Sequence, residues 1–142
     1  MRVYLDNCCY NRPFDDQNQL KILIESLAKL SIQRQMRDGT LEYAWSSVLD
    51  YEVGKSKLVD RAEQIKPWKH GAIANVLVDD SIRQRARELE ALGVKPMDAL
   101  HVACAESANC DWFLTTDRDL VKKTKSLSTL RIANPVDFIG AH

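Results

Sequence analysis

Four acidic residues lie where short apolar runs end or where helices are predicted to begin. Asp6 and Asp117 each follow an apolar run, whereas Glu52 and Asp98 fall near the starts of two predicted helices. Carboxylates that meet in a buried crevice repel one another, and a divalent cation relieves that repulsion. Oxygen ligands with few histidines favour Mg²⁺ or Mn²⁺ over zinc. Such an ion could activate water for hydrolysis of a phosphodiester bond.

Taken singly, each acid also has an ordinary structural explanation. Asp117 could cap the helix that follows it, and Asp98 could be a first-turn acid stabilised by the helix dipole. Glu52 could lie on a solvated helix face, and Asp6 could be a turn residue. The spacing alone leaves both explanations open, and the metal site depends on the four acids meeting.

The segments that must position these acids alternate between strand and helix. Strands are predicted from apolar runs at residues 3–5, 41–45, 76–78, 112–115 and 130–132. Helical spacing and capping residues predict the main helices at residues 16–37, 47–53, 81–92 and 97–108, with a loop at residues 7–16. Alternation of this kind is typical of parallel βαβ units. We therefore expect one α/β domain over residues 1–142, with a parallel sheet of about five strands flanked by helices in three layers. Its active site would lie beyond the carboxyl ends of the strands.

The helix predicted at residues 16–37 carries leucines at helical spacing. Leu20, Leu23, Leu27 and Leu30 lie three or four residues apart. Such a stripe is typical of a helix face that packs on a core. We expect this stripe to face the core, although part of it could contact a dimer mate or a partner helix.

The composition excludes several classes of protein. Lysine and arginine total 20, as do aspartate and glutamate, so the zero net charge argues against binding nucleic acid by bulk charge alone. With five glycines the chain has neither a G-x-G-x-x-G nor a P-loop pattern. No apolar run approaches the ~18 residues of a membrane span. The first six residues do not read as a signal peptide, so we expect a cytoplasmic protein without membrane contact.

The four cysteines do not have the spacing of a zinc site. Cys8 and Cys9 are adjacent, and Cys104 and Cys110 do not form a C-x₂-C pair. In the cytoplasm such cysteines are expected to be reduced. We predict buried thiols, with a redox role for Cys8 and Cys9 as the less favoured alternative.

Four segments carry a family resemblance that covers nearly the whole chain. They are VYLD at residues 3–6, SVLDYE at 47–52, PMDALHVA at 96–103 and FLTTDRDL at 113–120. In this order they resemble the signature regions of PIN domains, which are metal-dependent ribonucleases. Many bacterial PIN domains are the toxins of VapBC-type toxin–antitoxin pairs. The resemblance therefore implies a Mg²⁺- or Mn²⁺-dependent nuclease with an RNA substrate, a homodimer, and a small antitoxin protein as partner.

The resemblance also implies roles for particular residues. Asp6, Glu52, Asp98 and Asp117 match the acidic quartet that holds the metal. Asp119 matches a further acid near that site in some members. Thr115 or Thr116 matches a hydroxyl that supports the fourth acid.

One position departs from the family pattern. Many relatives carry Thr or Ser after the first aspartate, whereas Asn7 follows Asp6 here. Asn7 can still donate a hydrogen bond to a carboxylate or a phosphate. The departure affects the surroundings of the metal more than the metal ligands.

Other side chains are candidates for supporting roles. His101 shares a helix face with Asp98, where it could be a catalytic base or, as we favour, a packed histidine beside the site. Basic residues near the predicted strand ends could contact RNA phosphates. They are Arg12, Arg118, Lys122 and Lys123.

The sequence favours a metal-dependent endoribonuclease, the toxin of a toxin–antitoxin pair or a stand-alone RNA-processing enzyme. The alternative from another class is a catalytically weak PIN-like interaction module, suggested by the departure at Asn7. An aspartyl-phosphate phosphatase is disfavoured because Asp6 lacks a second aspartate two residues later.

Overall fold

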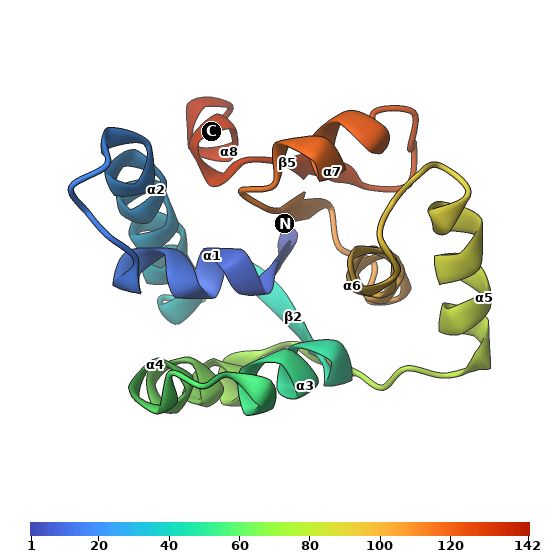
Figure 1. Cartoon of the computed structure of the whole chain (residues 1–142), viewed down its shortest axis with the longest axis horizontal. Helices are drawn as coiled ribbons and strands as arrows, with labels where there is room; N and C mark the ends of the chain where they lie inside the picture. The colour runs from blue at the N-terminus through green and yellow to red at the C-terminus, as the bar shows by residue number, and fades with distance from the viewer.

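The computed structural model describes all 142 residues and contains one five-stranded parallel sheet (Figure 1). The strands are β1 (Arg2–Leu5), β2 (Glu42–Ser46), β3 (Ala74–Val76), β4 (Trp112–Leu114) and β5 (Arg131–Ala133). They lie in the order β3-β2-β1-β4-β5, and every neighbouring pair is parallel. The predicted α/β class is confirmed. Because β1 and β4 are neighbours at the centre, Asp6 and Asp117 leave the same edge of the sheet.

Eight α-helices flank the sheet. They are α1 (Asn7–Asn11), α2 (Leu20–Arg37), α3 (Ser47–Lys55), α4 (Val59–Ile65), α5 (Asp80–Glu90), α6 (Pro96–Ser107), α7 (Arg118–Lys123) and α8 (Pro135–Gly140). Two 3₁₀ segments, η1 (Arg12–Phe14) and η2 (Lys66–Gly71), complete the elements. Helix α2 packs against α8, and α5 packs against α6 (Figure 1). None of these helices has the length and apolarity needed to cross a membrane.

Short polar side chains set the starts of three helices. Ser46 accepts a hydrogen bond from the backbone N–H of Leu49 and caps α3. Asp79 caps α5 through the N–H of Ile82, and Asp117 caps α7. Side-chain caps satisfy N–H groups that have no partner within the helix. The capping role considered for Asp117 from the sequence is confirmed, and local sequence determines where these three helices begin.

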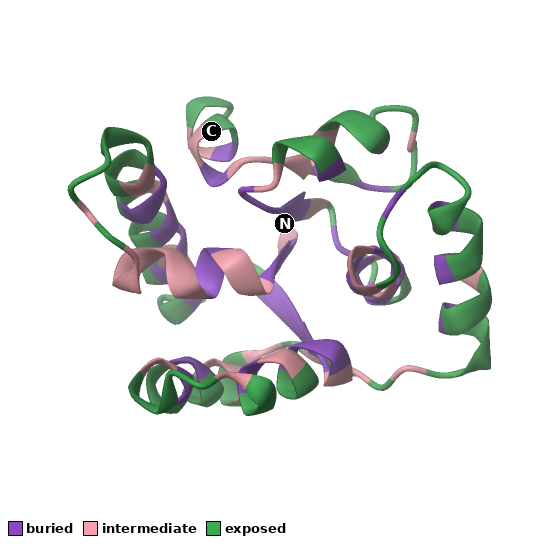
Figure 2. Cartoon of the chain, in the orientation of Figure 1, coloured by how far each residue is buried: buried purple, intermediate pink, exposed green.

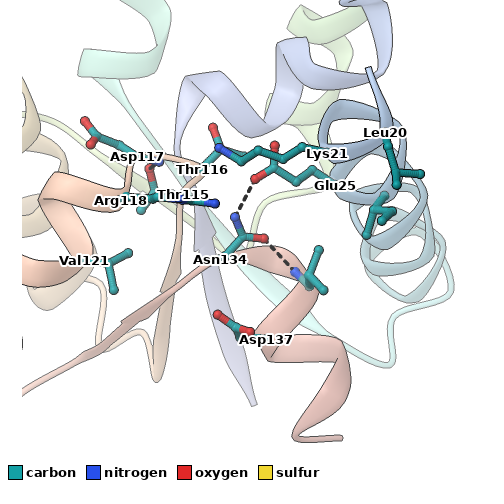
Figure 3. A pocket seen from close by; sticks show the side chains of 12 residues that line it. Leu20, Lys21, Glu25, Thr115, Thr116, Asp117, Arg118, Val121, Asn134 and Asp137 are labelled. Atoms are coloured by element: carbon teal, nitrogen blue, oxygen red, sulfur yellow. Dashed lines mark hydrogen bonds between the residues drawn. The ribbon is translucent and has the colours of Figure 1, made fainter. Parts of the chain in front are cut away.

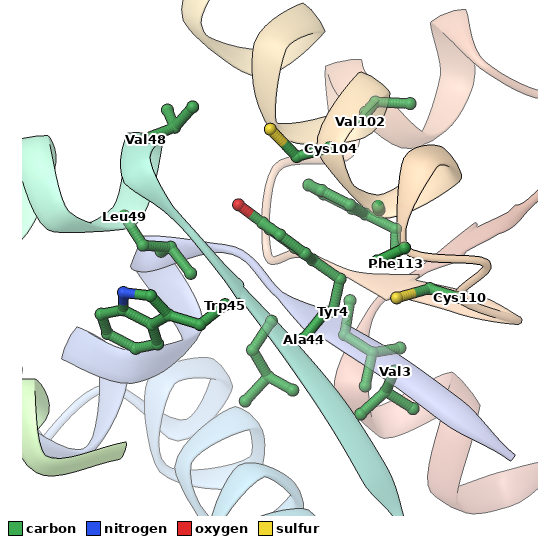
Figure 4. Packing of buried hydrophobic residues seen from close by; sticks show 14 of the residues in the cluster. Val3, Tyr4, Ala44, Trp45, Val48, Leu49, Val102, Cys104, Cys110 and Phe113 are labelled. Carbon is green, nitrogen blue, oxygen red and sulfur yellow. The ribbon is translucent and has the colours of Figure 1, made fainter. Parts of the chain in front are cut away.

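The core forms around the central strand (Figure 4). Val3, Tyr4 and Leu5 are all fully buried, as expected for a central parallel strand covered on both faces. The ring of Tyr4 stacks on that of Phe113 from β4, with ring centroids 5.2 Å apart. Trp45 of β2 is buried on the same sheet. This packing fixes the position of β1, the strand that ends next to Asp6.

Several local predictions were wrong. Residues 7–14 of the predicted loop at residues 7–16 form α1 and η1, because Asp6 caps α1 and Pro13 is tolerated inside the 3₁₀ turn. Helix α2 begins at Leu20 instead of residue 16, and β3 occupies residues 74–76 instead of 76–78. Helix α8 was not predicted.

The prediction that the leucine stripe of α2 faces the core was also wrong. Leu20 is 70% exposed and Leu27 59% exposed, and Leu23 and Leu30 are exposed as well. Figure 2 shows that α2 has both exposed and buried stretches. The buried face of α2 is largely polar and consists of Glu25, Ser26, Lys29, Ile32, Gln33 and Met36. Polar groups can occupy a buried face when partners from other elements satisfy them, and helical spacing cannot reveal those partners.

The cysteines form no disulfide, as predicted. Cys9, Cys104 and Cys110 are buried, whereas Cys8 is partly exposed. Burial raises the pKa of Cys104 to about 11 and that of Cys110 to about 12. These two thiols are therefore protonated and unreactive at neutral pH.

Candidate active site

Asp6 is the most constrained of the four acids. It stands at the end of β1 and is 7% exposed. Its Oδ1 accepts the backbone N–H of Asn7 at 2.8 Å, and its Oδ2 accepts the hydroxyl of Thr115 at 2.9 Å. The Oγ1 atom of Thr115 also accepts the backbone N–H of Asp117 at 3.1 Å. Thr115 therefore connects the first acid to the loop that carries the fourth.

Asp117 caps α7 with one carboxylate oxygen. Its Oδ1 accepts the backbone N–H groups of Asp119 and Leu120 at 2.9 and 3.3 Å. Both bonds use the same oxygen, so the structural role and a metal-binding role are compatible. The side chain of Asp119 is exposed on the first turn of α7.

Glu52 and His101 meet beside Asp6. The Nε2 atom of His101 hydrogen-bonds Oε1 of Glu52 and lies 3.8 Å from Oδ1 of Asp6. One potential ligand atom from each of these three residues lies within 4.8 Å of the others. The structure thus gathers side chains from β1, α3 and α6, which are far apart in sequence.

His101 is buried, and carboxylates surround it. Burial lowers its pKa, but the hydrogen bond that it makes to Glu52 and the negative charges of Asp6, Glu52 and Asp98 outweigh burial and raise the pKa overall. Its other ring nitrogen, Nδ1, lies 2.6 Å from the hydroxyl of Tyr4. His101 is therefore a packed histidine with both ring nitrogens engaged.

Asp98 lies in the first turn of α6 and is affected by the other acids. Burial, followed by the negative charges of Asp6 and Asp117, raises the pKa of Asp98 to about 6. Asp98 and Asp117 do not join the tight group around Asp6, Glu52 and His101. All four acids still belong to one region. The charges of Asp6 and Asp117 raise the pKa of Asp98, and Glu52 lies beside Asp6.

This region has the chemistry of a site for a hard divalent cation. Its available donors are mainly carboxylate oxygens, which Mg²⁺ and Mn²⁺ prefer. Burial is the largest cause of the raised pKa of Asp98, and the negative charges of Asp6 and Asp117 add to it. No thiolate set suggests zinc, since Cys8 is the one cysteine beside the acids. The residues present therefore fit a divalent metal ion.

Cys8, which the sequence analysis considered only as a buried thiol or a redox residue, contacts this region. Its Sγ lies 3.5 Å from Oδ2 of Asp6 and 3.5 Å from Oγ1 of Thr115, and it accepts the backbone N–H of Thr116 at 3.4 Å. The side-chain oxygen of Asn7 instead accepts a hydrogen bond from Asn11. The first acid is therefore contacted by the thiol of Cys8 and by the backbone N–H of Asn7, and not by the side-chain amide of Asn7.

Arg12 is held by protein side chains. Its Nη2 donates to the hydroxyl of Thr116 at 2.8 Å and its Nη1 to Asp15 at 3.2 Å. Its Nε lies 3.3 Å from Oε1 of Glu25, at ion-pair distance but without hydrogen-bond geometry. These contacts bind Arg12 to α2 and to the β4–α7 loop. The other predicted RNA contacts, Arg118, Lys122 and Lys123, are exposed on α7.

A cavity of about 480 Å³ opens beside Asp117, between α2, α7 and α8 (Figure 3). Its apolar lining is Leu20, Ile24, Val121 and Val136. In its lining Asn134 donates to Oε2 of Glu25 at 2.6 Å and accepts the backbone N–H of Val136. Neither Glu25 nor Asn134 was identified from the sequence, because their pairing joins segments 109 residues apart.

Comparison with known proteins identifies the family. The sequence profile of the PIN domain matches residues 20–126, which is most of the chain. The chain belongs to the PIN domain family. Its fold is similar to the crystal structure of VapBC2 from Rickettsia felis bound to a DNA fragment from their promoter, with a TM-score of 0.56 and 17% identity. That match covers 94% of this chain and 98% of the other. No curated protein sequence matches the chain. At the family level the match supports a nuclease.

Proposed function

We propose that this PIN domain is a Mg²⁺- or Mn²⁺-dependent endoribonuclease whose catalytic acids are Asp6, Glu52, Asp98 and Asp117. The observation that carries the proposal is the gathering of carboxylates at one edge of the sheet. Asp6 and Glu52 are within reach of one ion, and Asp98 is affected by the charges of Asp6 and Asp117. Membership of the PIN domain family supports the same function.

The residues of the chain position and balance this site. Thr115 holds the carboxylate of Asp6, and His101 holds that of Glu52. A bound divalent ion would polarise a phosphodiester and lower the pKa of an attacking water. The exposed cations of α7, Arg118, Lys122 and Lys123, would contact RNA phosphates, which makes binding salt-dependent.

The decisive test is RNA cleavage by the variant Asp98→Asn. The substitution keeps the size of the side chain but removes one negative charge. We expect cleavage of a single-stranded RNA with Mn²⁺ to fall at least about 100-fold, the scale of removing one group that stabilises a transition state. The matched control is Asp60→Asn, an exposed acid on α4. Equal activity of Asp98→Asn and wild type would eliminate the acidic site as the catalyst.

Binding of Mn²⁺ separates this proposal from a non-catalytic interaction module. A nuclease of this kind should bind Mn²⁺ in calorimetric titration, and Asp6→Asn should abolish that binding. An interaction module has no need of the ion. Absence of any heat of binding in the wild-type protein would favour the interaction module.

We further propose an antitoxin as partner, with the exposed leucine stripe of α2 as its docking surface. The structural neighbour from Rickettsia felis is a VapBC2 assembly, which makes a small partner protein the natural occupant. The leucines are spaced three and four residues apart, the pattern that packs against a second helix. Leu20 also lines the cavity beside Asp117, so the stripe continues toward the acids.

Coexpression with the product of an adjacent small reading frame tests this surface. Leu27→Asp should abolish copurification of that product, because the partner would have to bury a carboxylate. Leu77→Asp is the control, since Leu77 is also an exposed leucine, at 76% exposure, but lies away from α2. Retention of the partner by Leu27→Asp would exclude the α2 surface. A homodimer in the cytoplasm stays a prediction, and light scattering on the purified chain measures the assembly state.

A further inference from the structure

We propose that Tyr4 is a positioning residue for the metal site, acting on Glu52 through His101. This proposal rests on the proposed metal-dependent function. A buried chain of hydrogen bonds carries it. The hydroxyl of Tyr4 lies 2.6 Å from Oγ of Ser46 and 2.6 Å from Nδ1 of His101, and Nε2 of His101 bonds Oε1 of Glu52.

The carboxylate of Glu52 at one end of this chain of hydrogen bonds determines which group donates at each step. An ionised carboxylate can only accept hydrogen bonds, so Nε2 of His101 donates to Glu52. When the ring carries one proton, Nδ1 must accept, and the donor is the hydroxyl of Tyr4. The hydroxyl of Ser46 then donates to the oxygen of Tyr4. Every group in the chain is satisfied, and Tyr4 sets the ring orientation that presents Nε2–H to Glu52.

This chain of hydrogen bonds joins three of the four elements that carry the acids. Ser46 caps α3, and Glu52 lies on the same helix. Between Ser46 and Glu52 the chain of hydrogen bonds passes through Tyr4 on β1 and His101 on α6. Tyr4 stands two residues before Asp6, and His101 stands one turn after Asp98. The hydroxyl of Tyr4 therefore helps to set the position of Glu52 relative to the other acids.

This arrangement also assigns a role to His101. The cluster of Asp6, Glu52 and His101 has the residue types and distances of a metal site. Both ring nitrogens of His101 are already used, one by Tyr4 and one by Glu52. His101 therefore holds the carboxylate of Glu52 in place and is not itself a ligand.

The test compares two tyrosines that are equally buried. Tyr4→Phe removes the central hydroxyl and keeps the stacking on Phe113. Tyr10→Phe is the matched control, because Tyr10 is fully buried and its hydroxyl has no partner. Residues that orient metal ligands typically change metal affinity about 10–100-fold when mutated. We expect Tyr4→Phe to weaken Mn²⁺ binding by that factor and to lower kcat for RNA cleavage with little change in KM. Tyr10→Phe should leave all three unchanged.

A double-mutant cycle shows whether Tyr4 acts through Glu52. In a Glu52→Gln background, Tyr4→Phe should weaken Mn²⁺ binding by less than twofold further, because its target is already altered. A full additional loss would overturn the route through Glu52. A general packing role would instead lower thermal stability while leaving Mn²⁺ affinity intact, which would equally overturn the proposal.

A spectroscopic measurement on metal-free protein completes the test. The imidazole ¹⁵N signals of His101, assigned by their loss in His101→Gln, report the proton on each ring nitrogen. They should change in Tyr4→Phe and stay the same in Tyr10→Phe. Unchanged signals and unchanged Mn²⁺ affinity in Tyr4→Phe would refute the role of Tyr4. Failure of the proposed function appears differently, as a wild-type protein that binds no Mn²⁺ and cleaves no RNA.

Discussion

The variant Asp6→Asn should separate the stability of the fold from its capacity to bind metal. Without metal, the carboxylates at the sheet edge repel one another, and the charge of Asp6 follows burial as a cause of the raised pKa of Asp98. An asparagine can keep both contacts of Asp6, accepting the N–H of Asn7 and donating to Oγ1 of Thr115. We therefore expect the metal-free variant to be at least as stable as wild type, with a gain of at most about 1 kcal/mol after allowing for solvent screening.

With metal present, the order should reverse. A ligand at 100 times its dissociation constant stabilises a fold by about 2.7 kcal/mol. For a chain of 142 residues this corresponds to a rise in Tm of about 10 °C. Wild type should show that rise on addition of Mn²⁺, and Asp6→Asn should show little or none, because the most buried ligand has lost its charge.

Thermal unfolding followed by circular dichroism, in EDTA and in saturating Mn²⁺, measures both effects. Asp60→Asn serves as the control and should behave as wild type in both conditions. Two results would refute the reasoning. One is a metal-free Asp6→Asn protein that is clearly less stable than wild type, and the other is an equal rise in Tm for both proteins on addition of Mn²⁺.

Three further predictions follow from the buried charges. Lys29 is 2% exposed under the ring of Tyr10, and burial lowers its pKa from 10.5 to about 7. Between pH 7 and 10.5 the amine of Lys29 is protonated in the unfolded protein and neutral in the folded protein. The contribution of Lys29 to the free energy of unfolding therefore rises with pH over this range and is lowest below pH 7. Lys29→Met should remove that pH dependence and raise the free energy of unfolding by at most about 4 kcal/mol at pH 7. Identical urea-unfolding curves of the wild-type protein at pH 6 and pH 9 would contradict this. Asp98 has a pKa of about 6 and gains a proton as the pH falls through 6. The affinity for Mn²⁺ measured by calorimetry should therefore drop between pH 7 and 5, and an affinity that does not change over this range would contradict the role of Asp98. Arg12→Ala leaves Glu25, 2% exposed, without its cation and should cost about 2–3 kcal/mol in urea unfolding. Adding Glu25→Gln should restore part of that loss, and no recovery would show that packing, not charge, explains it.

Helix α2 shows how far local pattern can determine structure. The periodic leucines correctly predict a helix, because spacing sets which side chains share a face. Whether that face meets the core depends on what other elements offer. Here Arg12 and Asn134 provide partners for Glu25, and the ring of Tyr10 covers Lys29. Those partners make the polar face the buried one and leave the leucines for solvent or a partner protein.

By itself, the sequence determined what local chemistry controls. It determined the alternation of strand and helix, the capping residue Asp117, and the placement of acids after β1 and β4. Tertiary structure alone decided which of these groups touch. The chain from Ser46 through Tyr4 and His101 to Glu52, and the contact of Cys8 with Asp6, join residues from separate elements. Hydrogen bonds depend on distances and angles in three dimensions, and only the packed sheet with its helices establishes those distances.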